Sequence, residues 1–200
     1  MSTHRSRRLR TVAYDLEMDY NEKDDWGLLQ LLKGFHLFKR GGRKRISNIL
    51  SREDGLEGLK TNIFDYRYVI STGKSARRFR QTVFFVQSKA LFLPEFWMRP
   101  EHILHKVGSL IGLEDINFKE HPEFSNQYYL KGVDEELVRD AFQEEVLHYF
   151  TIEKNWYLEG VGYFFILYKK DFLMQPDQIK DFYSTGMELW RRLLRDWVNK

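Results

Sequence analysis

Hydrophobic and polar residues alternate along the middle of the chain, from about residue 60 to residue 70. Side chains of a β-strand point alternately to opposite faces, so every second residue shares a face. One face of this predicted strand collects mostly apolar side chains: Asn62, Phe64, Tyr66, Tyr68 and Ile70. We expect this face to be buried, in a sheet whose strands at 45–52, 60–70 and 78–86 are joined by glycine-containing turns.

The opposite face of the same strand carries Asp65 and Arg67. We expect these residues to form an ion pair with each other or with the neighbouring strand, whose Arg78 and Arg80 share that side. A lone carboxylate beside arginines has a lowered pKa and makes a poor general base. The pattern therefore favours a structural role for Asp65 over a catalytic one.

Apolar residues recur at helical spacing in four other segments, which predicts helices near 8–17, 101–111, 134–150 and 177–198. Aromatic and β-branched residues flank the glycines at 160 and 162 and predict a second hairpin over 156–169. Pro94 is expected to end the strand that precedes it. The segment 115–132 is expected to be irregular to extended.

These elements predict an α+β fold, a single domain over residues 1–200, with a mainly antiparallel sheet built from hairpins and covered by N-terminal, middle and long C-terminal helices. Residues 1–33 are expected to form an N-terminal helical and loop extension, residues 34–175 a sheet-rich body, and residues 176–200 the C-terminal helix. The pattern leaves open whether the sheet curls towards a half-barrel.

Composition strengthens the prediction of an aromatic-rich core, because 42% of the 200 residues are hydrophobic and 16% are aromatic. The absence of cysteine excludes disulfides and thiolate metal sites. The longest apolar run, at 161–168, is far shorter than the roughly 18 residues of a membrane-spanning helix. No apolar signal core follows the basic N-terminus. We therefore expect a soluble, cytoplasmic protein.

Charge is unevenly distributed, since residues 1–100 hold 20 Lys and Arg against 11 Asp and Glu, whereas residues 101–200 hold 12 against 18. The basic half contains two clusters around glycine turns, and these clusters are the candidate surface for an anionic partner. The alternative is that both are solvated turns whose charge the acidic half neutralises. Their members are Lys39, Arg40, Arg43, Lys44 and Arg45 in the first cluster, and Lys74, Arg77, Arg78 and Arg80 in the second.

The triplet Gly73-Lys74-Ser75 matches the end of a nucleotide-binding P-loop. That motif requires another glycine five residues before Gly73, where Tyr68 stands, and a helix after the serine, where β-prone residues follow. The triplet is therefore predicted to form a basic hairpin tip.

Candidate catalytic groups are present, but no segment assembles them into a recognisable motif. A hydrolase-like enzyme would use Asp65, Glu101, His102 or Glu159 in an aromatic-lined cleft. The cleft would be lined by Tyr66, Tyr68 and Trp97. A histidine metal site from His102 and His105, with His121 and Glu123, lacks any metalloprotease-type pattern. We expect no catalytic residue, no metal and no cofactor.

Several short strings form a distinctive combination, although each alone is weak. They are Asn48, Phe64-Asp65-Tyr66-Arg67-Tyr68, Gln81-Thr82-Val83, Leu93-Pro94-x-Phe96-x-x-Arg99-Pro100-Glu101 and, more loosely, Trp156-x-x-Glu159-Gly160. With this FDYRY…QTV…LPxFxxRPE pattern, residues 34–170 resemble a bacterial family of proteins of unknown function. The resemblance implies a bacterial origin and supplies no catalytic residue. Because some members carry membrane helices, it also implies a location close to a membrane.

The sequence therefore favours a non-enzymatic interaction or ligand-binding module over the hydrolase-like alternative. Its expected partner is an acidic protein surface or an anionic membrane surface, and in the second case the protein would be peripheral to the membrane. Nucleic acid is disfavoured by a net charge of only +3 and by the lack of a recognition motif.

Overall fold

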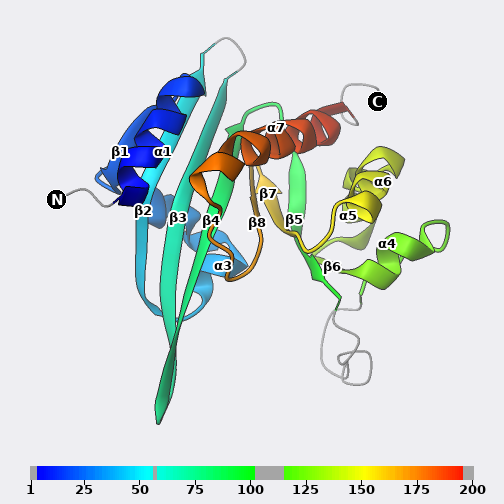
Figure 1. Cartoon of the computed structure of the whole chain (residues 1–200). Coiled ribbons are helices and arrows are strands. Elements are labelled where there is room, and N and C mark those ends of the chain that lie inside the picture. Colours follow the sequence, from blue (N-terminus) through cyan, green and yellow to red (C-terminus); the bar gives the residue numbers. More distant parts are fainter. Residues whose placement is uncertain (1–3, 56–57, 102–114, 196–200) are drawn as a thin grey trace.

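The structure is a computed structural model, which describes residues 4–55, 58–101 and 115–195 (Figure 1). Within these residues eight strands form one sheet in the order β1-β2-β3-β4-β8-β7-β5-β6, and every neighbouring pair is antiparallel. The β3–β4 hairpin runs past the other elements and ends in a free tip (Figure 1). The strands are β1 (Asp19–Lys23), β2 (Gly42–Asp54), β3 (Leu59–Thr72), β4 (Ser75–Ser88), β5 (Leu93–Pro100), β6 (Tyr128–Gly132), β7 (Tyr157–Gly162) and β8 (Phe164–Tyr168).

Helices cover both faces of the sheet. We call the two faces the α1/α7 face and the α2/α3 face, after the helices that lie on them. The α-helices are α1 (His4–Asp15), α2 (Leu28–Leu31), α3 (His36–Lys39), α4 (Pro122–Gln127), α5 (Glu135–Ala141), α6 (Glu144–Ile152) and α7 (Ile179–Arg195), with 3₁₀ turns η1 (Leu32–Gly34) and η3 (Pro176–Gln178).

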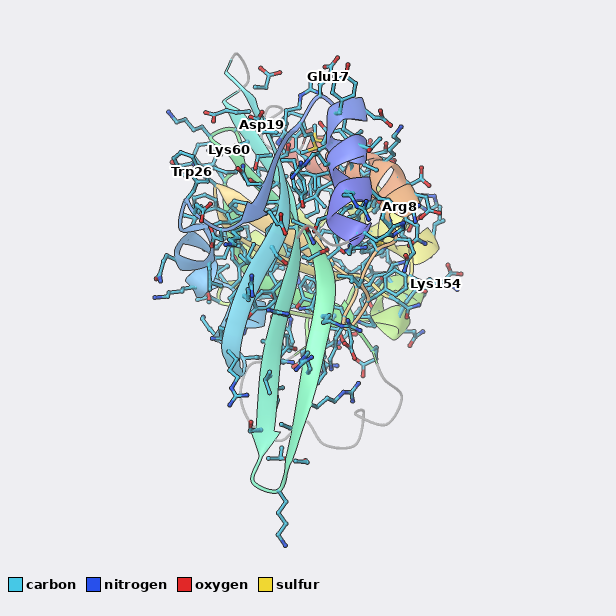
Figure 2. The ribbon with its side chains drawn as sticks, turned by 60° about the vertical axis from the view of Figure 1, so that its left-hand side comes forward. Arg8, Glu17, Asp19, Trp26, Lys60 and Lys154 are labelled. Carbon is cyan, nitrogen blue, oxygen red and sulfur yellow. The ribbon has the colours of Figure 1, made fainter. Side chains whose placement is uncertain are left out.

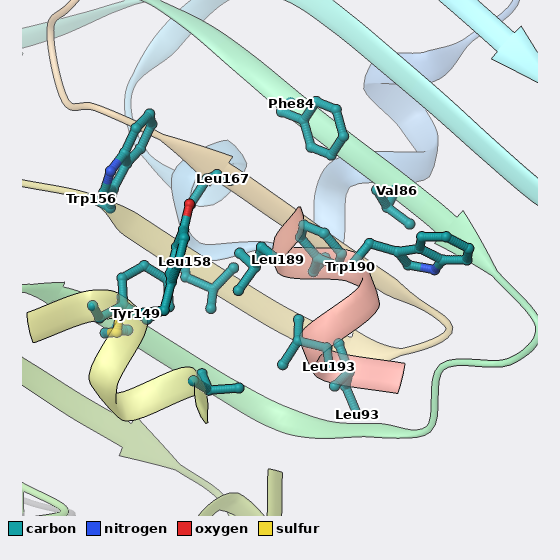
Figure 3. Close-up of a cluster of buried hydrophobic side chains, with 14 of the residues drawn as sticks. Phe84, Val86, Leu93, Tyr149, Trp156, Leu158, Leu167, Leu189, Trp190 and Leu193 are labelled. Carbon is teal, nitrogen blue, oxygen red and sulfur yellow. The ribbon is translucent and has the colours of Figure 1, made fainter. Parts of the chain in front are cut away.

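The larger hydrophobic core lies on the α1/α7 face. Phe84 and Val86 of β4 meet Leu189 and Leu193 of α7 there, and α5 and α6 extend the same cluster over β5 and β7 (Figure 3). On the α2/α3 face, the predicted row of Phe64, Tyr66 and Tyr68 packs under Leu32, Phe35 and Phe38. The central strands therefore bury apolar area on both faces, while their polar residues gather towards the hairpin tip and in the polar network around Asp65.

The α+β class, the antiparallel hairpins at 45–88 and 156–169 and the long C-terminal helix are confirmed. The sheet is not closed into a barrel, because β1 and β6 lie at its opposite edges. Asp65 does not pair with Arg67 or with the arginines of β4. Its carboxylate binds Arg5 of α1, at 2.7 Å between Nε and Oδ2.

Pro94 was predicted to end the preceding strand, but β4 already ends at Ser88 and Pro94 stands inside β5, which pairs with β6 and β7. The register of the β5–β7 ladder shifts between Leu93 and Phe96, so the proline falls where the regular pairing is interrupted. A proline lacks an N–H and is tolerated at such an irregularity. The sequence 115–132 likewise yields a strand, β6, and the short helix α4.

One helix prediction needs further correction, and another is not tested. The segment 134–150 forms two helices, because the chain leaves the helical conformation at Phe142 and Gln143 before α6 begins. Asp134 caps the first of them, because its carboxylate accepts a hydrogen bond from the Leu137 N–H. The helix predicted at 101–111 lies outside the described residues from 102 onward. Part of the predicted N-terminal extension is β1, an edge strand of the sheet.

No helix in the described ranges is long and apolar enough to cross a membrane.

Replacing Gly186 by alanine tests the contact between α7 and the sheet. A Cβ at this position would lie 2.4–2.5 Å from three ring atoms of Phe84, which is fully buried and packed against Phe165 and Phe182. Alanine normally gains about 1 kcal/mol over glycine inside a helix, but overpacking costs about 1–3 kcal/mol. We expect Gly186→Ala to lower the free energy of unfolding measured with urea.

The matched control is Gly34→Ala, where an added Cβ meets no atom within 4 Å. It should leave stability unchanged or raise it by up to about 1 kcal/mol. Equal effects at the two positions would contradict the packing of Gly186 on Phe84.

Candidate functional site

Three arginines lie side by side across the central strands. In the strand register, Arg45 of β2 is opposite Arg67 of β3, and Arg67 is opposite Arg80 of β4. Arg78 occupies the same face of β4 two residues nearer the hairpin tip. We call Arg45, Arg67, Arg78 and Arg80 the arginine face; it lies on the α1/α7 side of the sheet, and all four residues are exposed.

Like charges directly opposite each other in a sheet are destabilising. Within the described residues, no carboxylate contacts the guanidinium groups of the arginine face. The nearest acidic residue along β3 is Asp65, whose two oxygens already bind Arg5 at 2.7 and 2.8 Å. The arginine face therefore presents unbalanced positive charge to its surroundings.

A second group of cations lies on the α2/α3 side and consists of Arg40, Arg77, Arg99 and Lys170. Burial lowers the pKa of Lys170, and the positive charges of Arg40, Arg77 and Arg99 lower it further, while Asp171 opposes them. Arg77 binds Asp171 at 3.1 Å and lies 4.7 Å from the centre of the Phe79 ring.

Trp97 marks the outer part of this second group. The guanidinium carbons of Arg40 and Arg99 lie 5.8 and 5.6 Å from the centre of its ring, and His36 stacks on the indole at 5.2 Å. An indole attracts cations through its electron-rich face, so Trp97 partly balances charge that carboxylates would otherwise balance.

The two predicted basic clusters are thus neighbours in space, but strand alternation divides them between the two faces. Arg45, Arg78 and Arg80 belong to the arginine face, whereas Arg40 and Arg77 belong to the other group. Lys44 is tethered, because its Nζ donates to the Phe38 carbonyl at 2.5 Å. The remaining predicted contact residues are Lys39 at the end of α3, Arg43 near the start of β2 and Lys74 in the turn at the tip.

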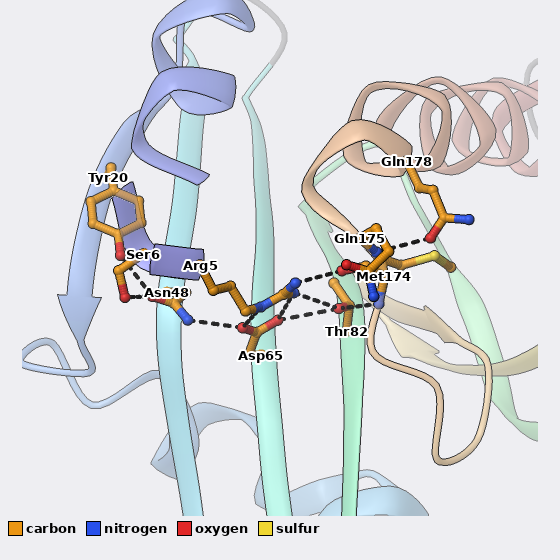
Figure 4. A network of polar contacts seen from close by, with 9 residues as sticks. All are labelled: Arg5, Ser6, Tyr20, Asn48, Asp65, Thr82, Met174, Gln175 and Gln178. Atoms are coloured by element: carbon orange, nitrogen blue, oxygen red, sulfur yellow. Dashed lines mark hydrogen bonds and ion pairs between the residues drawn. The ribbon is translucent and has the colours of Figure 1, made fainter. Parts of the chain in front are cut away.

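Asp65 is the centre of a polar network rather than a catalytic base (Figure 4). Besides Arg5, it accepts hydrogen bonds from Asn48 Nδ2 at 2.9 Å and Thr82 Oγ1 at 3.2 Å. Arg5 also donates to the Met174 carbonyl at 2.7 Å, which ties the network to the connection before α7. The network joins α1, three strands and that connection, and it leaves Asp65 no free oxygen for a substrate.

Glu159 forms a second network on the opposite face of the sheet. Its side chain is 1% exposed and accepts hydrogen bonds from the backbone N–H groups of His36 and Leu37, at 2.5 and 3.0 Å, and from the Tyr168 hydroxyl at 3.0 Å. Burial raises the pKa of Glu159 to about 7, although the hydrogen bonds act in the other direction. This carboxyl fixes the start of α3 to β7.

Of the groups named for a hydrolase-like cleft, Glu159 and Trp97 are partners in the register of β7 and β5. Glu101 follows β5, and its N–H donates to the Gln127 carbonyl at 2.8 Å. Asp65 and Glu159 lie on opposite faces of the sheet, and both are enclosed by hydrogen-bond donors. Tyr66 and Tyr68 are core residues, and His102 and His105 lie outside the described residues. Among the residues that the structure describes, no three His, Cys, Asp or Glu side chains are grouped as metal ligands would be.

The predicted contact surface missed Arg67, Arg99 and Lys170. Arg67 was assigned to an ion pair with Asp65, but its parity along β3 already placed it beside Arg78 and Arg80. No sequence pattern marks Arg99 and Lys170 as neighbours of the basic clusters, because β5 and the end of β8 come close to those clusters only through the tertiary fold.

No family model and no curated protein matches the chain. Among solved structures, the chain is similar to the crystal structure of the mycobacterial trehalose monomycolate transport factor A, TtfA, with a TM-score of 0.60 and 14% sequence identity. The alignment covers 96% of this chain and 94% of that chain. At this identity the similarity shows the fold alone.

Glu159 gives a prediction for the pH dependence of stability. Its pKa is about 7 in the folded chain against the ordinary 4.5, so the folded state binds the extra proton between those values. Its contribution to stability is therefore present below about pH 4.5 and is lost as pH rises to about 7. At about 1.4 kcal/mol per pH unit, this loss is about 3 kcal/mol.

Glu159→Gln carries no titrating proton, so urea unfolding from pH 4.5 to 8 should show a smaller decline than in the wild type. Other titrating groups cancel in the difference between the two proteins. Parallel stability curves would contradict the raised pKa.

Proposed function

We propose that this protein is a non-enzymatic binding module whose arginine face contacts an anionic partner. The observation that carries the proposal is the direct pairing of Arg45, Arg67 and Arg80 across three strands without a neutralising carboxylate among the described residues. Each such like-charge pair costs on the order of 0.2–1 kcal/mol. An anionic partner would turn that cost into binding energy.

The geometry suits a partner with several closely spaced anionic groups. Neighbouring strands lie roughly 4.8 Å apart, so the arginine row presents its planar guanidinium groups at short, regular intervals. Arginine binds phosphate and carboxylate through two parallel hydrogen bonds. We take an anionic membrane surface as the partner, because the exposed hairpin carries cations on both faces and Lys74 at its tip. A flat layer of phosphates could contact several of them together.

Two further observations support binding over catalysis. Two of the candidate catalytic carboxyls, Asp65 and Glu159, lie on opposite faces of the sheet and are enclosed by hydrogen-bond donors. The similar fold of TtfA belongs to a protein named as a transport factor, and such a role rests on binding. We extend to this chain only the general idea of a component that acts by binding.

Charge removal tests the proposal. The triple variant Arg45→Gln, Arg67→Gln, Arg80→Gln should bind vesicles of phosphatidylglycerol and phosphatidylcholine on the order of 100-fold more weakly at low salt. The estimate follows from about 1 kcal/mol per cation near an anionic surface. Cosedimentation with vesicles would measure the binding, which should also weaken for the wild type as salt is added.

The control variant removes three exposed lysines distant from the arginine row: Lys89→Gln, Lys119→Gln and Lys154→Gln. It has the same net charge as the arginine variant and should keep most of the binding. If both variants lost vesicle binding equally, the effect would depend only on net charge and not on the arginine row. If the wild type bound neither anionic vesicles nor an acidic peptide at low salt, the proposal would be abandoned; binding to the peptide alone would replace the membrane by an acidic protein.

The unbalanced charge also predicts a gain in stability. Arg67→Gln relieves repulsion with both Arg45 and Arg80, so it should raise the free energy of unfolding by about 0.2–1 kcal/mol while weakening binding. The gain should shrink at high salt. Lys60→Gln is the control on the same strand, since Lys60 has a carboxylate partner, Glu53, at 3.4 Å. A loss of stability in Arg67→Gln would mean that Arg67 has a structural partner.

A further inference from the structure

A groove of about 570 Å³ lies on the α2/α3 side of the sheet, at the end away from the β3–β4 tip. Its floor is formed by β1 to β4, and its wall by the segment from Trp26 to Leu31. Figure 2 shows Asp19, Trp26 and Lys60 together at this end of the strands. The volume falls within the range of small-molecule sites, roughly 300–1,000 Å³.

The strand register orders the floor into rows. Asp19, Ser51, Asn62 and Phe85 are successive partners across β1 to β4 and therefore share one face. Polar side chains thus stand beside the Phe85 ring. The adjacent row consists of Glu53, Lys60 and Gln87.

Asn62 is the strongest sign of a ligand. The residue is 4% exposed, its Oδ1 accepts a hydrogen bond from Ser51 Oγ at 2.9 Å, and its Nδ2 has no hydrogen-bond partner in the described part of the chain. Whichever way the amide is turned, Ser51 engages one of its polar atoms and leaves the other. A buried polar group without a partner costs about 1–3 kcal/mol, so a ligand that bonds to it recovers that cost.

The groove has little net charge to offer. Asp24 uses both carboxylate oxygens at the start of α2, where they accept hydrogen bonds from the Leu28 and Leu29 N–H groups at 2.8 Å. Glu53 and Lys60 form an ion pair at 3.4 Å. With Asp19 and Arg52 the lining holds three carboxylates and two cations. This slightly negative lining contrasts with the arginine face and disfavours an anionic ligand.

Trp26 stands at the rim with 85% of its surface exposed. At the rim of a groove, a large exposed aromatic side chain offers a ring face on which a ligand can pack. The positively polarised C–H groups on one face of a sugar ring pack well on an indole, and sugar hydroxyls act as both donors and acceptors. The sugar hydroxyls would therefore match the mixed amide, hydroxyl and carboxylate groups of the floor.

We propose that the groove binds a neutral sugar of one or two hexose units. The ring packs on Trp26, and a hydroxyl group hydrogen-bonds to the side-chain amide of Asn62. This binding is independent of the arginine face, so either proposal can fail without the other.

Saturation-transfer NMR with glucose, maltose and sucrose at millimolar concentration tests the site. We expect at least one sugar to give a signal with the wild type, and Trp26→Ala to weaken its affinity about tenfold through the lost ring contact. Tyr14→Ala is the matched control, because Tyr14 is also 85% exposed and does not line the groove. It should leave the affinity unchanged.

Asn62→Leu removes the amide while keeping a similar side-chain volume. It should abolish most of the sugar binding without unfolding the protein, because it also removes the buried group that has no partner. Circular dichroism would check the fold. The proposal is overturned if none of the three sugars binds the wild type, if Trp26→Ala and Tyr14→Ala have equal effects, or if a folded Asn62→Leu variant binds sugar as the wild type does.

Discussion

The ion pair between Arg5 and Asp65 is the interaction on which the arrangement of the molecule depends. It joins the first helix to the central strand, and the hydrogen bonds around it extend to Asn48, Thr82 and the Met174 carbonyl. A partly buried carboxylate with this many donors is well satisfied, whereas removal of one charge from such a pair leaves the other uncompensated. The network also commits Asp65, which would otherwise be available to Arg67. The structural role of Asp65 thus leaves the arginine face without its nearest counter-charge.

Strand alternation determines how that charge is presented. The two basic clusters meet because β2, β3 and β4 are neighbours, yet a period of two sends successive residues to opposite faces. Arg78 and Arg80 therefore face the α1/α7 side, while Arg77 faces Phe79 and Asp171 on the other side. Only the first group is left without a carboxylate in contact, within the described residues. The distinction separates a candidate contact surface from cations that are already partly balanced.

The parts of the fold predicted from sequence are those governed by local pattern. Alternation predicted the hairpins of β2 to β4 and the inward row from Phe64 to Tyr68, and helical spacing predicted the helical segment that contains α5 and α6. The strand β5 escaped prediction because Pro94 is a local signal for an ending, while the pairing that tolerates it is supplied by β7 and β6 from distant sequence. The same reason applies to the site. The sequence shows Lys74 and its neighbours as a basic cluster. The partner of Asp65 could not be assigned from the sequence, because Arg5 reaches Asp65 only through the tertiary fold.

The two proposed sites lie on one rigid unit and point in different directions. β3 and β4 pair without interruption from Leu59 and Ser88 to Thr72 and Ser75. Asn62 and Arg67 are five residues apart on β3, about 17 Å at the usual rise per residue, and they lie on opposite faces because five is odd. A partner on the arginine face would therefore leave the groove open on the other side of the sheet. Since no step of the pairing between them is broken, an occupant of the groove would be held at a fixed distance from that partner.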